Sequence, residues 1–491
     1  MEFIDKQFEK ISFGQPVSHI KLIYMAFLAY PLAFIMKKLK KTQSRHLFSI
    51  IPGFIIMYIL FNEKALHLIG CATLVYIILR LNLPHKIITV WVTTFAWLSL
   101  LHLQVESDKG TGYKCDVTGS FMILTLKLIS LASNLVDGKK DPEKLRGQMK
   151  LHRVTEMPTI IEYVSYLFYY GSINVGPLFD FVPFKNFITR KMFLNDKNDK
   201  KQIEKEKGIL RRANWAGLKI LSFSIITMIM YLALGMKFDY EDVTSPKIQN
   251  SNFIVRHLNF YFLGLYLRTR YYLAFFNTEG ANIIAGFGYN GTDENGNEKW
   301  DQVTNVKLKP TEFPKHSRDY LNNWNYQVCV WMRNYVYFRI NSKPTPLRKN
   351  IGQIATFVLS SFWHGFRYCY YIIFPLCLPF DYADRMLMKA IAPYLKGKDG
   401  KPNKTRVLIY ETINRIFVTL YWSGSITVFF ISYSFEQTKI LIKMTYIPLI
   451  IIPWAIIIII TLKNMFFRKK RTRSDKSEKE KKNQNESKKK N

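Results

Sequence analysis

Residues 215–236 read WAGLKILSFSIITMIMYLALGM, an apolar stretch in which Lys219 is the one charged residue. A helix needs roughly 20 mostly apolar residues to cross the hydrocarbon core of a bilayer, so this stretch is long enough to span a membrane. Similar stretches lie at 21–36, 47–61, 65–79, 87–104, 407–434 and 445–467. The sequence therefore predicts an all-helical membrane protein that crosses the bilayer several times.

Other apolar stretches carry ionisable residues. They lie at 119–136, 159–182, 253–276, 326–340 and 351–380 and contain Lys127, Glu162, His257, Arg268, Arg333 and His364. A charged group in hydrocarbon is costly, and backbone in lipid must satisfy its own hydrogen bonds. We therefore expect these stretches to face protein or a cavity instead of lipid, and we expect about ten spans in all.

The average composition hides this organisation. An apolar share of 48% and a mean hydropathy of −0.03 suit a soluble protein, but the 70 Lys and Arg residues, against 36 acidic ones, are concentrated between apolar stretches. The 37 Phe and 29 Tyr argue against a disordered chain. Five cysteines include no Cys-x-x-Cys pair, so neither a disulfide framework nor a zinc site is indicated. We expect no metal and no cofactor.

The ends of the chain differ from its body. Residues 1–18 lack a basic region followed by an apolar one, so they are predicted to be a surface arm and not a signal peptide. Residues 19–467 form the predicted membrane domain. The tail 468–491 is almost wholly polar and is predicted to be disordered. This tail and the basic loops predicted at 137–156 and 190–212 should be cytosolic.

The last residues of the tail contain a pattern that is typical of a targeting signal. Lys488 and Lys489 stand fourth and third from the carboxyl end. This arrangement resembles the dilysine retrieval signal of endoplasmic-reticulum membrane proteins. It predicts a multi-pass protein of the endoplasmic-reticulum membrane.

His364 is the strongest candidate for chemistry. It lies in ATFVLSSFWHGF, residues 355–366, a segment apolar enough to be buried. An ionisable residue in such a place indicates a functional site, although a packed histidine bonded to a backbone carbonyl would look the same in sequence. A neutral imidazole can take a proton from a hydroxyl and return it later, which is the work of a general base.

Asn325 is the second candidate. It lies in NNWNYQVCVWMRNYVYFRI, residues 322–340, at the start of an aromatic stretch. An asparagine is a directional donor and acceptor that can hold a carbonyl oxygen or an imidazole in place. It can equally cap a helix. The basic segment SKPTPLRKN separates it from His364, so the two residues belong to different helices.

Two segments, NNWNYQVCVWMRNYVYFRI at 322–340 and SSFWHGFRYCYY at 360–371, resemble the two signature regions of the membrane-bound O-acyltransferases. The active centre of that family combines the asparagine of a Trp-Asn pair with a later Trp-His-Gly histidine. Four further segments, 115–138, 157–181, 268–291 and 305–325, resemble in order the regions of the lysophospholipid acyltransferase branch. The resemblance implies a bundle of about ten or eleven transmembrane helices. Re-entrant segments would surround a chamber in which acyl-CoA from the cytosol meets a lysolipid from the bilayer.

The resemblance also implies roles for particular residues. His364 and Asn325 would be catalytic, and the expected substrate-binding residues are Trp324, Trp363, Gly365, Arg367, Glu279 and Asp116. Glu279 and Asp116 fall where this branch has acids, but pairing with Arg268, Arg270 or Lys127 is an equal alternative. Family members commonly continue Trp-His-Gly with Pro-Gly-Tyr, whereas this chain has Phe366-Arg367-Tyr368. Arg367 should therefore either meet a substrate phosphate or pair with an acid such as Asp381.

The sequence thus predicts an enzyme that transfers a fatty acyl chain from acyl-CoA to the free hydroxyl of a lysophospholipid. The expected partners are these two substrates and the bilayer, with no nucleic acid. One alternative is another enzyme of this family, with a sterol, diacylglycerol or protein acceptor. Another is a transporter that uses His364 in a proton pathway. A cysteine nucleophile is disfavoured, because no cysteine has a histidine beside it in sequence that could act as its base.

Overall fold

The computed structural model describes residues 2–10, 17–81, 83–107, 116–174, 176–193, 199–343, 345–422, 432, 434–446 and 450–466. Across these residues the regular structure is helical, and the β pairs are two isolated bridges, Thr292 with Glu298 and Lys396 with Pro402. The all-helical fold expected from the sequence is confirmed. The tail from residue 468, with Lys488 and Lys489, lies outside the described residues.

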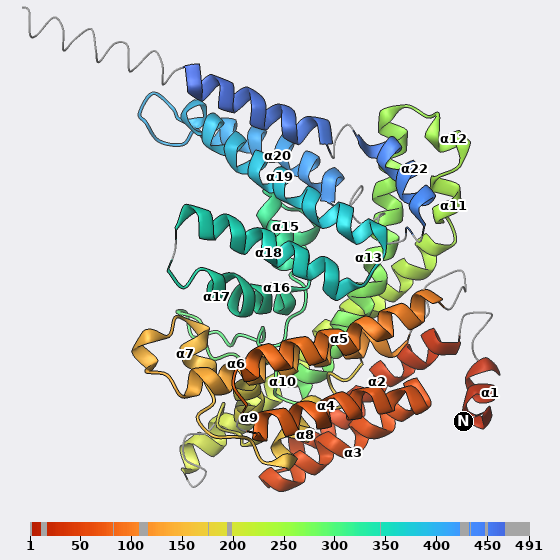
Figure 1. Ribbon diagram of the computed structural model, residues 1–491, viewed down its shortest axis with the longest axis vertical. Coiled ribbons are helices and arrows are strands. Elements are labelled where there is room, and N and C mark those ends of the chain that lie inside the picture. Colours follow the sequence, from red (N-terminus) through yellow and green to blue (C-terminus); the bar gives the residue numbers. More distant parts are fainter. Residues whose placement is uncertain are drawn as a thin grey trace, which may run out of the picture.

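The helices follow one another with few long links (Figure 1). The first are α1 (Glu2–Lys10), α2 (Val17–Lys38), α3 (Thr42–Phe61), α4 (Ala65–Arg80), α5 (Lys86–Ser107), α6 (Val117–Gly138), α7 (Gln148–His152), α8 (Ile160–Leu167) and α9 (Phe181–Ile188). The middle ones are α10 (Lys200–Gly235), α11 (Tyr240–Val243), α12 (Pro246–Gln249), α13 (Phe253–Ile284), α14 (Leu308–Glu312), α15 (Ser317–Asn323), α16 (Tyr326–Met332) and α17 (Phe338–Ile340). The last are α18 (Pro346–His364), α19 (Tyr368–Ile391), α20 (Lys404–Thr419), α22 (Phe435–Tyr446) and a helix at Ile452–Phe466.

Two helices that carry site residues, α6 and α18, start at side-chain caps. Asp116 accepts the backbone N–H of Thr118 at the start of α6. Thr345 accepts that of Arg348 at the start of α18, where Pro346 occupies the first turn. These caps satisfy N–H groups that have no partner within the helix, and proline fits the first turn because it lacks an N–H.

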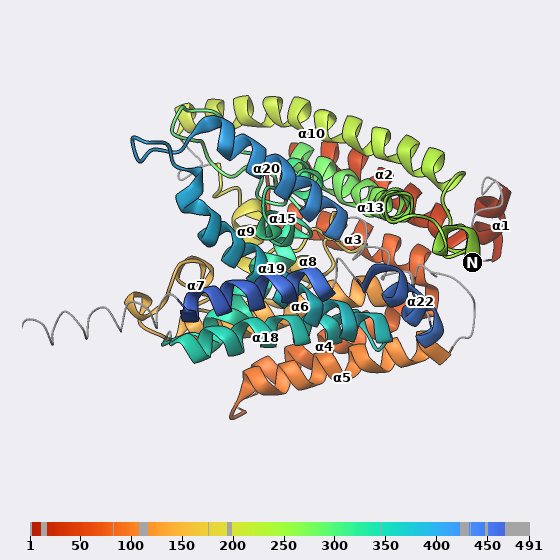
Figure 2. The ribbon, with the colours of Figure 1, turned by 90° about the horizontal axis from the view of Figure 1, so that it is seen from above.

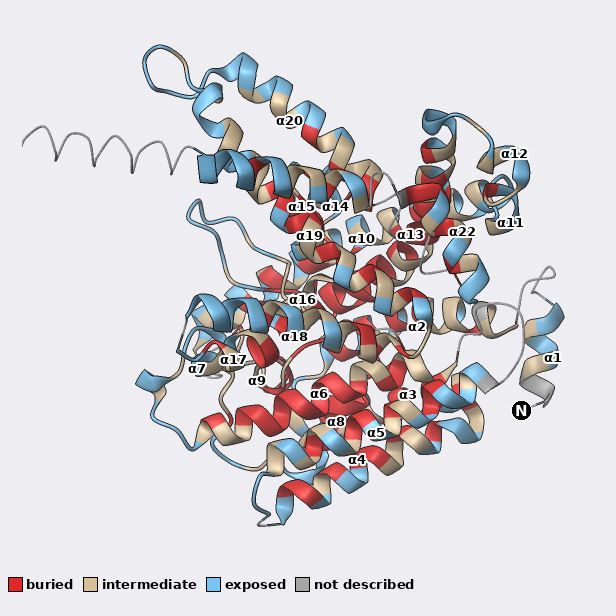
Figure 3. Cartoon of the chain, turned by 45° about the horizontal axis from the view of Figure 1, so that its top comes forward, coloured by how far each residue is buried: buried red, intermediate tan, exposed pale blue. Residues whose placement is uncertain are grey.

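Within the part of the chain that the structure describes, five stretches are long and apolar enough to cross a membrane: Ile20–Lys38, Thr42–Arg80, Lys86–Glu106, Val117–Gly138 and Lys200–Gly235. Thr42–Arg80 contains two of the predicted spans, which become α3 and α4. The chain is therefore a membrane protein with several spans. Val117–Gly138 is 72% buried, against 17–39% for the other four, which confirms that 119–136 faces protein (Figure 3).

Other expectations need correction. Segment 159–182 is no single span, because α8 ends at Leu167 and an irregular segment follows it. Segment 351–380 is divided between α18 and α19. Segment 190–212 is not a loop throughout, because α10 begins at Lys200 and carries its basic first turns straight into the apolar stretch. Lys, Glu, Arg and Gln are good helix formers, so charge alone did not indicate a loop there.

The two largest hydrophobic clusters of the described residues, which we call the two cores, hold the bundle together. The first core joins α2 to α6, α8 and α9 with parts of α13, α16 and α18, and the second joins α13, α15, α19 and α20 with Trp422 and α22. Figure 1 shows α2 to α5 at one end of the long axis and α19, α20 and Ile452–Phe466 at the other. Seen from above, α10 runs along one side and α5 along the opposite one (Figure 2). Helix α13 packs against both α10 and α2 and contributes to both cores.

Candidate active site

A chamber of about 1380 Å³ lies between the two hydrophobic cores. Val328, Met332 and Trp363 of its wall belong to the first core, and Tyr320 and Ile373 belong to the second. The chamber exceeds the roughly 300–1,000 Å³ of a typical small-molecule pocket. Its wall is mainly apolar, with room for a long chain.

Most residues expected at the site meet in this chamber. His364, Asn325, Trp324, Trp363, Arg367 and Asp116 all line it. Gly365 and Glu279 are not among the lining residues. The chamber also contains residues that the sequence gave no reason to select, among them His102, Asn277 and Arg318. Their helices lie far apart in the chain, so a single sequence carries no signal of their proximity.

His364 is the last residue of α18. Gln353, Thr356 and Ser360 of the same helix also line the chamber, at spacings that place them on one helical face with His364. The imidazole packs between Tyr370 and Phe374 of α19, with ring centroids 5.4 and 5.3 Å away. The histidine therefore ends a row of polar side chains on α18 in a wall that is mainly apolar.

The backbone beside His364 is held from two sides. The indole Nε1 of Trp363 donates to the carbonyl oxygen of Met122 on α6, at 3.1 Å. The carbonyl oxygen of Trp363 is 3.2 Å from Nε2 of His102 on α5. Gly365 follows at φ 113° and ψ −161°, and α19 begins at Tyr368. This chain lacks the Pro-Gly that commonly follows Trp-His-Gly in the family, but its backbone still turns sharply after His364.

Asn325 lies between α15 and α16 with left-handed backbone, φ 46° and ψ 52°. It occupies the N-cap position of α16, but its side chain makes no capping hydrogen bond. Capping therefore does not explain this asparagine. The neighbouring Trp324 is surrounded by the rings of Tyr271, Tyr272, Phe275 and Tyr320, with centroids 5.7–6.2 Å away.

Charged groups also reach the chamber. Arg367 pairs with Glu106 on α5, with Nε 3.4 Å from Oε1. Pairing of Arg367 with an acid was one of the two expected alternatives, and it is found. The acid is not Asp381, which pairs with Arg318 and Arg385. Asp116 caps α6 while lining the wall.

Two of the basic partners considered for Glu279, Arg268 and Lys127, are engaged elsewhere. Arg268 forms a two-bond ion pair with Glu312, with N–O distances of 2.7 and 2.8 Å, and Tyr272 donates its hydroxyl to the same carboxylate. Lys127 donates to the carbonyl oxygen of Tyr166 and to Oγ of Ser172. Glu279 instead accepts the hydroxyl of Thr304, at 2.6 Å.

Two cysteines line the chamber. Cys329 lies 3.0 and 3.2 Å from the carbonyl oxygens of Leu321 and Trp324, and Cys377 lies 3.2 Å from that of Ile373. Both thiols thus donate to backbone. These contacts give neither cysteine a base that would activate it as a nucleophile.

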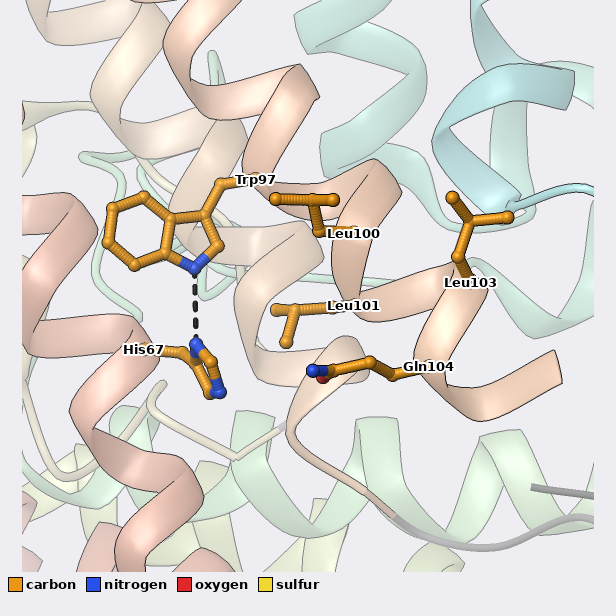
Figure 4. A pocket seen from close by; sticks show the side chains of 6 residues that line it. All are labelled: His67, Trp97, Leu100, Leu101, Leu103 and Gln104. Carbon is orange, nitrogen blue, oxygen red and sulfur yellow. Dashed lines mark hydrogen bonds between the residues drawn. The ribbon is translucent and has the colours of Figure 1, made fainter. Parts of the chain in front are cut away.

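A smaller pocket of about 500 Å³ lies on α4 and α5 (Figure 4). Its lining includes Leu100, Leu101, Leu103 and Gln104, and Nε1 of Trp97 donates to Nδ1 of His67 at 3.3 Å. Among the described residues, those that line this pocket include no carboxylate, arginine or lysine. The large chamber, with its histidines, asparagines and arginines, is therefore the better candidate site.

Comparisons with known proteins agree with this choice. A model described as the membrane-bound O-acyltransferase family matches residues 109–421. Lysophospholipid acyltransferase 2 of Arabidopsis thaliana is 28% identical over 465 residues, which cover 94% of this chain and 96% of that protein. A lysophospholipid acyltransferase of Schizosaccharomyces pombe is 26% identical over 85% of this chain and 82% of its own length. Lysophospholipid acyltransferase 5 of Mus musculus is 26% identical over 74% and 72%.

Proposed function

This chain belongs to the membrane-bound O-acyltransferase family, and we propose that it moves a fatty acyl group from acyl-CoA to the free hydroxyl of a lysophospholipid. The family makes it an O-acyltransferase of the membrane. The names of the three relatives support a lysolipid acceptor. The observation that carries the proposal is that His364 and Asn325 line one mainly apolar chamber.

The proposed reaction is a direct transfer. His364 takes the proton of the lysolipid hydroxyl while that oxygen attacks the thioester carbonyl carbon. A new C–O ester bond forms, the C–S bond breaks, and the departing thiolate takes a proton. Asn325 donates from its amide to the carbonyl oxygen or aligns the imidazole. A covalent acyl-enzyme is not needed.

The wall of the chamber supports both substrates. Coenzyme A and lysophospholipids carry phosphates, which arginine binds through two parallel hydrogen bonds. Arg270, Arg318, Arg333 and Arg367 line the chamber and are the candidates for this contact. The apolar lining suits the acyl chains, because burying each CH₂ group is worth about 0.8 kcal/mol.

The decisive experiment is an acyl-transfer assay on microsomes that contain this protein, with acyl-CoA and a panel of lysolipids. Product formation without any ion gradient separates an enzyme from a transporter, and the panel separates lysolipids from sterol, diacylglycerol and protein acceptors. His364→Ala should lower turnover by about 10²–10⁴-fold because the general base is lost. The control His257→Ala removes a buried imidazole of α13 that does not line the chamber, and it should keep turnover. Wild-type turnover in a well-folded His364→Ala sample would contradict the mechanism.

We also propose residence in the endoplasmic-reticulum membrane with a cytosolic tail. The dilysine arrangement of Lys488 and Lys489 supports this location. Replacing both lysines with serine should let the protein leave the endoplasmic reticulum, as followed by microscopy. Activity should be unchanged, because the tail contributes nothing to the proposed chemistry. If the variant stays in the endoplasmic reticulum, Lys488 and Lys489 are not a retrieval signal.

A further inference from the structure

The left-handed backbone of Asn325 must be held by its surroundings. Its φ of 46° and ψ of 52° lie in a region that costs an L-residue roughly 1–2 kcal/mol, although asparagine tolerates it better than most. Asn325 lies in the link between α15, which ends at Asn323, and α16, which begins at Tyr326. No helix fixes the backbone in this link, so the direction of the side chain depends on the φ and ψ of Asn325 itself. A small backbone rotation here would swing the amide away from the reacting groups.

Residues 302–307, which we call the strap, run beside this link and bond to both of its ends. The three hydrogen bonds run from Tyr326 N–H to the carbonyl oxygen of Asn305 at 2.6 Å, from Lys307 N–H to that of Asn323 at 3.1 Å, and from Nε2 of Gln327 to that of Gln302 at 3.0 Å. Asn325 is thus fixed through its neighbours on either side. The conformation of the asparagine therefore depends on where the strap lies.

Glu279 of α13 anchors the strap. Its Oε1 accepts the hydroxyl of Thr304 at 2.6 Å, and the backbone N–H of Asn305 faces the same carboxyl group. All three residues are buried. In this low-dielectric setting a hydrogen bond to a carboxyl group is strong, and its loss leaves a buried polar group unsatisfied.

From these contacts we infer that Glu279 is a positioning residue for acyl transfer. It holds Thr304 and Asn305, Asn305 holds Tyr326, and the backbone so fixed directs the amide of Asn325 into the chamber. Glu279 does not line the chamber and so acts without touching the substrate. The inference rests on the proposed function, because it assumes that Asn325 takes part in the transfer.

Thr304→Val is the cleanest perturbation, because valine keeps the shape of threonine and removes the hydroxyl. Thr278→Val is the matched control. Thr278 is buried on α13 beside Glu279, but its hydroxyl donates to the carbonyl oxygens of Ala274 and Phe275 within the helix. Thr304→Val should lower kcat about tenfold and leave both KM values within about twofold, since one strong hydrogen bond corresponds to roughly that factor. Thr278→Val should keep kcat.

A second pair of variants tests the carboxyl group itself. Glu279→Gln keeps an oxygen that accepts the Thr304 hydroxyl and should retain most of kcat. Glu279→Leu removes the acceptor and should lose at least as much as Thr304→Val. Hydrogen exchange supplies a readout without turnover: Thr304→Val should speed exchange of peptide 323–327, and Thr278→Val should not.

A double-mutant cycle separates this inference from the proposed function. If Asn325→Ala lowers kcat, Thr304→Val should add little in that background, because the group it positions is gone. A full tenfold loss there, or unchanged exchange and kcat in the single variant, overturns the positioning role and leaves the function intact. Wild-type turnover in Asn325→Ala would instead overturn the role of Asn325 in the proposed function, and this inference with it.

Discussion

Substituting Gly365 by alanine should damage both the stability and the activity of the protein. Gly365 has φ 113° and ψ −161°, a backbone region open essentially to glycine alone. A Cβ atom there would lie 3.0 Å from Nδ1 of His102 and 3.2–3.3 Å from two other atoms of that ring. Nε2 of the same ring is hydrogen-bonded to the carbonyl oxygen of Trp363.

The magnitude follows from this geometry. Holding alanine in such a backbone region costs about 1–3 kcal/mol. The chain can avoid this cost only by rotating the backbone at 365, which turns His364 and strains the contact between His102 and Trp363. We therefore expect the free energy of unfolding to fall by about 1–3 kcal/mol. We also expect kcat/KM to fall at least about tenfold, equivalent to about 1.4 kcal/mol of transition-state stabilisation.

The assay combines thermal denaturation in detergent with steady-state acyl transfer on the same sample. Gly400→Ala is the control, because Gly400 also has a positive φ, of 73°, but nothing lies within 4 Å of its Cβ position. It should lose about 1 kcal/mol of stability and keep turnover. If Gly365→Ala behaves like this control, or like the wild type, the backbone at 365 has no part in positioning His364.

Three further outcomes are expected. Glu312→Leu strands the buried guanidinium of Arg268 and should cost about 3–5 kcal/mol in unfolding free energy; Arg268→Met in the same chain should recover most of it, and a lower stability of the double variant would contradict the buried-pair account. Arg367→Gln should raise the apparent KM of one phosphate-bearing substrate, whereas Glu106→Gln should not; equal effects of both changes would indicate a purely structural pair. His316 has a raised pKa because of the carboxylate of Asp384 on α19, whose Oδ1 lies 3.6 Å from Nδ1 of the imidazole; the stability from this pair is present at low pH and is lost as pH rises above about 6.5, so the melting temperature should fall there and His316→Gln should flatten the profile.

The sequence alone was enough to predict the helical membrane body. The stretches at 21–36 and 87–104 each lie within one helix of the structure, and 215–236 extends beyond α10 only by Met236. The need to bury about 20 apolar residues is a local property of the chain. The ionisable Lys127 correctly indicated that its segment faces protein. The charged residues at 200–212 were predicted to form a loop, but they form the first turns of α10. Most of them are good helix formers, so the helix extends from the apolar stretch through the charged one.

The sequence was enough to select residues of the candidate site, but it did not predict which residues contact one another. His364 and Asn325 were selected from the chemistry of their side chains and from the resemblance of their segments to the two signature regions of the family. That both line one chamber, that Glu279 holds Thr304, and that Arg367 pairs with Glu106 follow only from the packing of helices distant in sequence. Hydropathy acts along a few helical turns, whereas a hydrogen bond depends on where two backbones meet in space, so only the tertiary structure decided those partners.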